Sequence, residues 1–284
     1  MNLLAGITRR ILRLPFLRKH YYGIYIKVLK PLGLFRNTSL IHHYDEGLKI
    51  KLNLGDWLQQ QIYFFDAFDE RGLLFLKKNL KEGDVFVDVG ANIGCYTLVA
   101  AKLVGPTGRV FAFEPVSFVF EHLQFNLQLN GFSQVIPERL ALLNKPGSVE
   151  LHIANKENLG MSSIFHHDTE SGITERAEAV SLDDYVAGAG IDQINIVKID
   201  IEGAELEALM GMEQSLNRFR PLLIVEISDE VLHTDAIRKQ QTLEWLKKHR
   251  YVRKWLSLSG QLLDQPDKHS GNYFNFVFLP EENL

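Results

Sequence analysis

Short apolar runs alternate with segments of helical apolar spacing along most of this chain, from Lys81 onward. Such alternation predicts strands separated by helices, and hence a mostly parallel sheet with helices on both faces. The strands expected in that sheet are Val85–Val89, Val110–Phe113, Val135–Leu142, Ile194–Ile199 and Leu222–Ile227. We therefore predict the α/β fold class.

Apolar residues recur every three or four positions in four segments, which predicts helices over residues 95–104, 116–130, 202–216 and 235–249. Strict alternation over residues 148–154 predicts a strand with one solvent-exposed face, and residues 177–186 read as a strand that leads into a short helix. The segments Tyr251–Leu258 and Tyr273–Leu279 are expected to close the fold as an antiparallel pair.

The bulk composition excludes several classes of protein. The 284 residues carry a formal net charge of -4, so there is no global signature of nucleic-acid binding, and we expect no nucleic-acid partner. Cys95 is the only cysteine, which excludes a disulfide within the chain and a cysteine-based metal cluster, and suits a reducing compartment. No run approaches the ~20 apolar residues of a membrane-spanning helix, and we expect a cytoplasmic protein without a signal peptide.

The charge is unevenly spread, because the segment Met1–Tyr44 contains eight basic residues and no acid. We predict a basic, helical N-terminal extension over residues 1–60 and a main domain over residues 61–284. Its first apolar residues keep helical spacing: Leu3, Leu4, Ile7, Ile11 and Leu14. Two interpretations stay open. The favoured one is a helix packed on the main domain with its arginines in water, and the other is contact between residues 1–36 and the inner face of an anionic membrane.

Parallel sheets bind ligands outside the carboxyl ends of their strands. The first strand end reads "VDVGANIG" and offers Asp88, Gly90, Ala91, Asn92 and Gly94 just before a predicted helix. The spacing departs from G-x-G-x-x-G, which weakens a pyrophosphate-binding or nicotinamide-dependent interpretation. A zwitterion suits the turn better, with its ammonium at the aspartate and its carboxylate at the turn amides.

The second strand ends in Glu114, about 20 residues after the glycines, where a carboxylate accepts hydrogen bonds from the two hydroxyls of a ribose. Alone, each glycine fits a plain turn and the glutamate fits a surface carboxylate. The combination is more specific. A strand, a glycine turn, a helix and a second strand that ends in an acid follow one another in this order, which predicts a nucleoside ligand.

The stretch "VFVDVGANIGCYTLVAAKLVGPTGRVFAFEP" resembles the S-adenosylmethionine-dependent methyltransferases of the FkbM type, as do "RLALLNKPGSVELHI", "GMSSIF", "VSLDDYV" and "VKIDIEGAELEALMGM". The resemblance covers about residues 70–228. It implies a Rossmann-like class I methyltransferase fold with a terminal antiparallel strand. It also implies methyl transfer to an oxygen of a sugar, glycan or polyketide-like small-molecule acceptor.

The resemblance assigns site residues as well. The turn from Asp88 to Gly94 is similar to the methionine-binding turn of the family, and Glu114 is similar to its ribose-binding acid, followed by Pro115. Leu140 and Ala141 would lie beside the adenine. Cys95 departs from the bulky residue common after that glycine, which we expect to affect packing.

Methyl transfer to an alcohol benefits from a base that takes the proton. Asp200 ends the fourth strand beside the expected ligand, Glu202 follows it, and His166 lies in a polar segment, so these three are the catalytic candidates. Glu205, three residues further on, can instead have a structural role, because acids stabilise the start of a helix. The alternative for His166 is that it is simply an exposed loop residue without a catalytic role. A magnesium ion between Asp200 and Glu226 is a possibility that we do not favour, since two carboxylates alone are weak evidence for a metal site.

The sequence thus predicts an S-adenosylmethionine-dependent O-methyltransferase. Methyl transfer to nitrogen, which needs less help from a base, is the alternative within enzymes. A scaffold that binds the nucleoside without catalysis is the alternative outside them.

Overall fold

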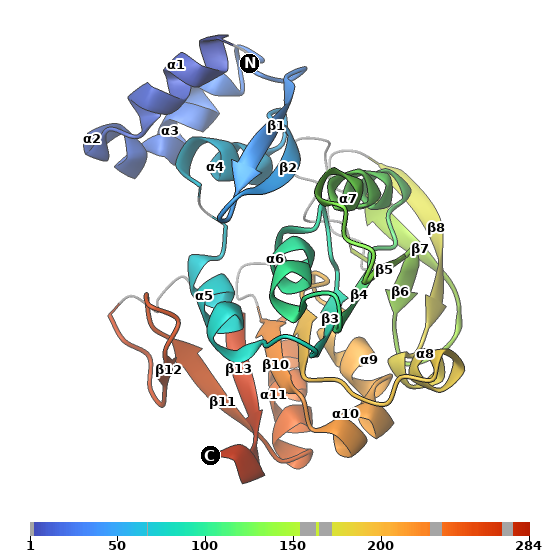
Figure 1. Cartoon of the computed structure of the whole chain (residues 1–284). Helices are drawn as coiled ribbons and strands as arrows, with labels where there is room; N and C mark the ends of the chain where they lie inside the picture. The colour runs from blue at the N-terminus through green and yellow to red at the C-terminus, as the bar shows by residue number, and fades with distance from the viewer. Residues whose placement is uncertain (1–2, 67, 154–162, 165–171, 228–234, 269–274) are drawn as a thin grey trace.

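The computed structural model describes residues 3–66, 68–153, 163–164, 172–227, 235–268 and 275–284. An eight-stranded sheet lies at the centre, with the order β12-β11-β13-β10-β9-β3-β4-β5 (Figure 1). Its strands are β3 (Val85–Val89), β4 (Arg109–Phe113), β5 (Val135–Glu138), β9 (Ile196–Ile199), β10 (Leu222–Glu226), β11 (Tyr251–Leu256), β12 (Leu262–Leu263) and β13 (Asn275–Pro280).

Five neighbouring strands of this sheet, β5, β4, β3, β9 and β10, run parallel. The last strand, β13, lies antiparallel between β10 and β11. A mostly parallel sheet that ends with an antiparallel strand confirms the Rossmann-like α/β fold class. It also confirms the antiparallel pairing expected for the two closing strands.

Helices cover both faces of the sheet (Figure 1). The helices of the main domain are α5 (Glu70–Asn79), α6 (Cys95–Val104), α7 (Ser117–Asn130), α8 (Leu182–Ala189), α9 (Glu205–Met210), α10 (Glu213–Phe219) and α11 (Asp235–Lys248). Successive side chains of one strand enter different apolar clusters, since Phe86 packs in one and Val85 and Val87 in the other. Continuous apolar runs in the sequence therefore reflect burial on both faces of the sheet.

One predicted strand is wrong, because residues 135–142 are divided between two sheets. β5 ends at Glu138, whose carbonyl accepts from the Glu114 amide, and the chain then leaves the large sheet. β6 (Leu140–Leu142) pairs with β8 (Ile173–Val180), which also pairs with β7 (Gly147–Ile153) in a three-stranded sheet.

The helix predicted over residues 202–216 is also wrong in its extent, since it begins only at Glu205 and breaks between α9 and α10. The break lies at Gly211, where a Cβ would approach the Leu143 carbonyl oxygen to 2.0 Å. The side chain of Asp183 then caps α10 by accepting from the amides of Gln214 and Ser215. Contacts with distant segments, which apolar spacing does not encode, end and restart this helix.

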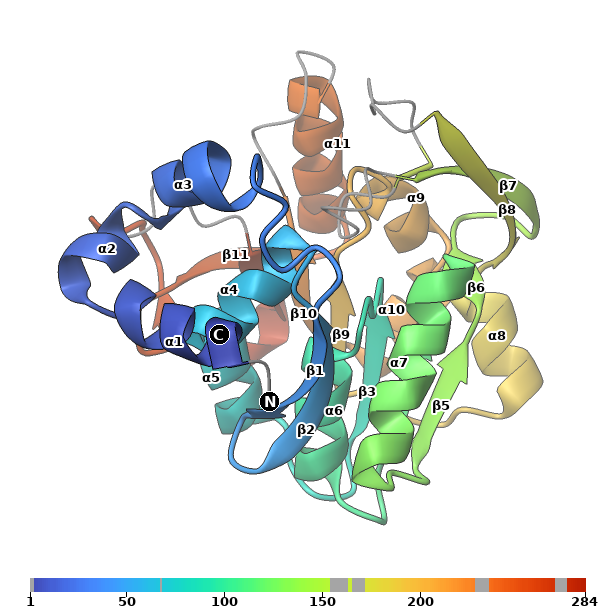
Figure 2. The same ribbon diagram turned by 90° about the horizontal axis from the view of Figure 1, so that it is seen from above.

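The N-terminal part of the chain forms α1 (Leu3–Leu12), α2 (Pro15–Lys19), α3 (Tyr21–Ile24), a π-helical turn over Tyr25–Leu29, the hairpin β1 (Ser39–Tyr44) and β2 (Leu48–Asn53), and α4 (Trp57–Phe65). Seen from above, α1, α2 and α3 lie on the opposite side of the molecule from β7 and β8 (Figure 2). The predicted boundary at residue 60 falls inside α4. The division into extension and main domain stays a prediction.

The N-terminal hairpin is joined to the main domain by side-chain amides of α7. The Asn126 side chain accepts from the Lys51 amide at 2.7 Å and donates to the Ile93 carbonyl at 2.8 Å. Asn130 accepts from the Lys49 amide at 2.8 Å and donates back to the Lys49 carbonyl at 2.7 Å. These bonds connect the edge of β2 with the turn that follows β3. Among the described residues, none of the helices combines the length and the apolar composition needed to cross a bilayer.

Candidate active site

A cavity of about 720 Å³ lies at the carboxyl ends of β3, β4, β9 and β10. Its lining includes the strand-end residues that the sequence singled out: Asp88, Gly90, Ala91, Asn92, Glu114, Pro115, Leu140, Ala141, Asp200 and Glu202. We call these ten residues, together with Glu226 at the end of β10, the strand-end wall. Gly94, in contrast, does not line the cavity, and His166 lies outside the described residues.

The turn after β3 depends on glycine for reasons of backbone packing. Gly90 has a φ of +79°, and a Cβ there would lie 1.9 Å from the carbonyl oxygen of Asp200. Gly94 has a φ of +96°, and its Cβ would lie 2.8 Å from Leu123. Both positions favour glycine because a side chain would collide and because the left-handed region is strained for other residues. Gly90 thus allows the close approach of β3 and β9 and also borders the cavity, whereas Gly94 allows the close approach of α7.

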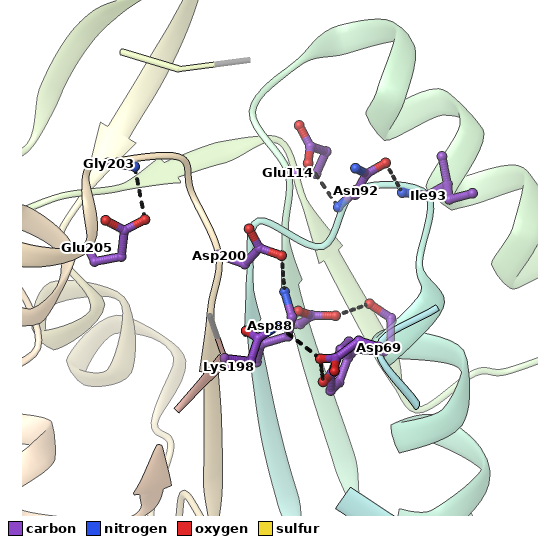
Figure 3. Close-up of polar contacts among 12 residues, drawn as sticks. Asp69, Asp88, Asn92, Ile93, Glu114, Lys198, Asp200, Gly203 and Glu205 are labelled. Carbon is purple, nitrogen blue, oxygen red and sulfur yellow. Dashed lines mark hydrogen bonds and ion pairs between the residues drawn. The ribbon is translucent and has the colours of Figure 1, made fainter. Parts of the chain in front are cut away.

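The amides of this turn have hydrogen-bond partners within the protein, and the anion site expected at them stays a prediction. The Gly90 and Ala91 amides both donate to the Phe113 carbonyl, at 3.0 and 2.9 Å. The Asn92 amide donates to Glu114 Oε2 at 3.0 Å, and the Asn92 side chain accepts from the next amide at 2.7 Å (Figure 3). Since the Gly94 amide donates to the Ala91 carbonyl, each amide from residue 90 to residue 94 has a partner, either in the turn itself or at the end of β4.

Asp88 is fully buried at the end of β3. Its Oδ2 atom accepts from the Thr97 hydroxyl at 2.6 Å, while Oδ1 is buried without a hydrogen-bond partner. Burial raises the pKa of this carboxyl, and the nearby Lys198 ammonium opposes that rise. A buried oxygen without a partner at a cavity wall is a site for a ligand cation, because leaving it unsatisfied costs about 1–3 kcal/mol. This fits the ammonium predicted at Asp88.

Glu114 is buried at the end of β4, and both of its oxygens accept backbone amides. Oε2 accepts from Asn92 and Oε1 accepts from Val116, each at 3.0 Å. Burial raises the pKa of Glu114 to about 7, although these two hydrogen bonds favour the ionised form. A carboxylate oxygen has capacity for a second donor, so the fixed carboxylate can still accept from a ligand hydroxyl.

Three ionisable side chains, those of Lys198, Asp200 and Glu226, interact at the ends of β9 and β10. The Lys198 ammonium lies 2.9 Å from Asp200 Oδ2 and 5.0 Å from the ring centroid of Tyr96 (Figure 3). Burial acts to raise the pKa of Asp200, but the lysine and a hydrogen bond from Glu226 outweigh it and hold that pKa below its usual value. The charge of Asp200 and burial raise the pKa of Glu226 well above its usual value. These opposite shifts favour the ionised form of Asp200 and the protonated form of Glu226.

Glu202 lies two residues beyond Asp200 in a turn with a left-handed φ of +51°. Burial, with the charges of Asp200 and Glu205, raises its pKa to about 8. Glu205 has its pKa raised to about 7 by burial, accepts from the Gly203 amide at 3.0 Å, and does not line the cavity (Figure 3). Ser163 donates to the Glu202 carbonyl at 2.7 Å, which secures the strained turn.

The opposite side of the cavity comes from the first 71 residues of the chain, and the sequence analysis missed it. We call this set the N-terminal wall: Arg18, Trp57, Leu58, Gln61, Phe68, Asp69, Glu70 and Arg71. It is tied to the sheet by Asp69, which accepts from the Tyr96 hydroxyl and from Asn275 Nδ2, the latter at 3.1 Å. Asn275 is 206 positions away in the chain, and no local pattern in the sequence signals such a contact.

A magnesium ion at the two strand-end acids stays a possibility that we do not favour. Asp200 and Glu226 share a hydrogen bond, and the Lys198 ammonium pairs with Asp200 at 2.9 Å. Over the described ranges, no group of three or more His, Cys, Asp or Glu side chains is arranged to hold a metal ion.

Comparison with known proteins decides the family. The model of the methyltransferase FkbM domain matches residues 88–257, which is more than half of the chain and includes the whole strand-end wall. The chain belongs to the FkbM methyltransferase family. The resemblance found in the sequence is thereby confirmed.

Two relatives indicate the breadth of this family. The FkbM-family chain is 32% identical over 152 residues to a hexuronic acid methyltransferase, AglP, of Haloferax volcanii, which covers 54% of the chain and 59% of that protein. It is 27% identical over 187 residues to the 31-O-demethyl-FK506 methyltransferase FkbM of Streptomyces tacrolimicus, over 55% of the chain and 70% of that protein. The chain thus spans less than two thirds of the haloarchaeal relative.

Among solved structures, the FkbM-family chain is similar to the methyltransferase FkbM of Methylobacillus flagellatus KT. The identity is 17% and the TM-score is 0.48, over 92% of this chain and 60% of that one.

Proposed function

We propose that this chain is an S-adenosylmethionine-dependent O-methyltransferase that acts on a hydroxyl of a sugar, glycan or polyketide-like acceptor. The observation that supports it most is the juxtaposition, in one cavity, of the unpartnered Asp88 oxygen, the Glu114 carboxylate and the acids after β9. The activities for which the two relatives are named, on a hexuronic acid and at a 31-O position, agree with a sugar acceptor and with oxygen as the methylated atom.

The strand-end wall suits the cofactor. Asp88 would accept the ammonium of the methionine moiety at its unpartnered Oδ1 atom, and Glu114 would accept ribose hydroxyls. Leu140 and Ala141 would lie beside the adenine, and Pro115 would shape the turn next to it. When bound, S-adenosylmethionine supplies a methyl group that is already activated on a sulfonium.

Glu202 is the residue best suited to take the proton of the acceptor hydroxyl. A general base works best with a pKa near the working pH, and its pKa is raised to about 8. Asp200 is less suitable as a base, because its ion pair with Lys198 at 2.9 Å stabilises the carboxylate. We assign Asp200 to positioning Lys198 and to the negative potential beside the sulfonium. His166, in the segment outside the described residues, stays a candidate from the sequence alone.

The test is a calorimetric titration with S-adenosylhomocysteine, with NAD in parallel, followed by turnover assays. Turnover is scored as release of S-adenosylhomocysteine in the presence of free and nucleotide-activated hexuronic acids and neutral sugars. Binding of S-adenosylhomocysteine alone is expected, and binding of NAD or of neither ligand would contradict the proposal. Binding without turnover on any acceptor would instead favour the non-catalytic scaffold.

The role of Glu202 is tested with Glu202→Gln against Glu205→Gln, a matched control with a raised pKa but no place in the cavity lining. We expect the first variant to lose at least about 100-fold in turnover, a typical contribution of general base catalysis, with unchanged affinity for S-adenosylhomocysteine. The control should keep most of its activity. Turnover by the wild type should rise with pH toward about 8, because the base must be ionised, and equal losses in both variants would refute this role.

A further inference from the structure

The exposed apolar surface of this chain is concentrated in its first helices. Twenty large hydrophobic residues are exposed among the described residues, and ten of them fall within residues 3–32. We call these ten the N-terminal apolar patch: Leu3, Leu4, Ile7, Ile11, Leu14, Phe16, Tyr22, Ile26, Val28 and Leu32. Large exposed apolar patches on soluble domains mark interaction sites, whereas single exposed apolar residues are ordinary.

The orientation of α1 explains why its aliphatic side chains are exposed. The helix packs on α4 through Ala5 and Leu12, which are buried. Arg9 and Arg13 both pair with Asp66 at the end of α4, while Arg10 is exposed to solvent. Arg13 Nε also donates to the Phe64 carbonyl at 2.8 Å.

The remaining face of α1 is therefore the aliphatic one. Leu3, Ile7, Ile11 and Leu14 follow one another at helical spacing, and all four are exposed. Two arginines thus hold the helix against the protein while its leucines and isoleucines face outward. This is the reverse of an amphipathic helix that covers a protein core.

The charge around the patch favours one class of partner. The segment up to Tyr44 contains eight basic residues and no acid, and its exposed bases include Arg10, Arg18, Lys19 and Lys27. A second copy of this chain would bring two such basic surfaces together, which electrostatic repulsion disfavours. A bilayer with anionic lipids offers negative headgroups to the bases and a hydrocarbon boundary to the aliphatic side chains.

We propose that residues 3–32 lie on the surface of an anionic lipid bilayer, with the N-terminal apolar patch entering the boundary between headgroups and acyl chains. Phe16 and Tyr22 suit that boundary, where aromatic residues are enriched. The same segment contributes Arg18 to the cavity lining, so this contact brings the cavity close to the headgroups. The proposal is independent of the reaction that the cavity performs.

The test is flotation of the full chain with vesicles of phosphatidylcholine alone or with one quarter phosphatidylglycerol. The wild type should bind the anionic vesicles at least about tenfold more strongly, and added salt should weaken binding. Ile7→Asp/Ile11→Asp should reduce that binding at least about tenfold, since it removes apolar contact and adds two repelled charges. These side chains are 48% and 49% exposed, so the variant is expected to fold, which unfolding curves verify.

The matched control is Ile173→Asp/Ile237→Asp, which changes isoleucines that are 47% and 64% exposed outside the patch. It should bind the anionic vesicles within about twofold of the wild type. Failure of the wild type to float with anionic vesicles would overturn the proposal, and so would an equal loss of binding in the control. A dimer in sedimentation that Ile7→Asp/Ile11→Asp abolishes, with no flotation, would assign the patch to a second copy. Titration with S-adenosylhomocysteine separates each of these outcomes from failure of the proposed function.

Discussion

The two walls of the cavity are built in different ways. In the strand-end wall, short runs of residues are fixed by the sheet and by hydrogen bonds between neighbouring strand ends, as with Asn92 and Glu114 at 3.0 Å. The N-terminal wall gathers single side chains from α2, α4 and α5, such as Arg18, Trp57 and Arg71. Only the first wall lies within the residues that the family model matches.

On the proposed function, the contrast indicates where the specificity for the acceptor is encoded. On the proposed function, the strand-end wall holds what every member of the family has to hold, the methyl donor. The N-terminal wall then faces the acceptor with Arg18, Arg71 and the indole of Trp57. A comparison restricted to the family domain therefore includes the strand-end wall but leaves out the N-terminal wall, which on the proposed function selects the acceptor.

The largest effect is expected from Gly90→Ala, which places a side chain in the turn after β3, where the strand-end wall approaches the end of β9. A Cβ at this position would lie 1.9 Å from the Asp200 carbonyl oxygen, on a backbone with a φ of +79°. We expect a loss of more than about 2 kcal/mol in the free energy of unfolding and no measurable binding of S-adenosylhomocysteine. Thermal unfolding and calorimetry measure the two effects.

The matched control is Gly188→Ala in α8, where a Cβ meets nothing within 4 Å. Alanine favours a helix over glycine by up to about 1 kcal/mol, so this variant should be as stable as the wild type or slightly more stable. Equal stability of the two variants would show that β3 and β9 do not need their close approach.

A pH effect should come from Glu114. Its pKa is about 7 in the folded protein, against 4.5 for the ordinary group, so the folded state keeps a proton that the unfolded chain has already released. The free energy of unfolding should therefore fall as pH rises from about 5 to about 7, by up to roughly 3 kcal/mol from this residue. Urea unfolding at several pH values measures the slope.

Glu114→Gln removes the titrating group and should flatten that slope. Glu150→Gln, at an exposed glutamate of β7, should leave it unchanged. A slope of the same size in Glu114→Gln and in the wild type would mean that the buried carboxyl does not control it.

Asn126→Ala tests the connection between the N-terminal hairpin and the main domain. This fully buried amide connects Lys51 of β2 with Ile93 of the turn after β3. Its loss leaves a buried donor and a buried acceptor without partners, at a cost of about 2–3 kcal/mol in unfolding free energy. Asn130→Ala breaks the similar pair of bonds to Lys49 in a more exposed place and should cost about 1 kcal/mol or less. Equal costs would contradict the inferred role of burial at this connection.

The smallest effect is expected from Arg18→Ala on cofactor affinity. Arg18 lines the cavity from the N-terminal wall, so the affinity for S-adenosylhomocysteine should stay within about twofold. Asp88→Asn in the strand-end wall should lower the affinity for S-adenosylmethionine at least about tenfold, because a buried charged hydrogen bond is lost. A large loss in Arg18→Ala would remove the distinction between the two walls.

The sequence predicted the parallel strands and the ends of β3, β4, β9 and β10 because apolar runs buried on both faces leave a clear local pattern. It did not predict that residues 135–142 divide between two sheets or that a helix breaks at Gly211, since contacts far along the chain decide both. The N-terminal wall was missed for the same reason, as the bond between Asp69 and Asn275 illustrates. The hydrogen bonds of the turn amides could not be predicted either, because their partners, such as the Phe113 carbonyl, come from another strand.

The single cysteine of this chain has a practical consequence. Cys95 is buried beside the cavity, next to Tyr44 of β1, and burial raises the pKa of its thiol to about 12. Since the thiolate is the reactive species, the raised pKa and the burial of Cys95 both slow its reaction with a thiol reagent. Because Cys95 lines the cavity, a ligand held between the two walls should slow the labelling of the unaltered protein further, in proportion to its occupancy.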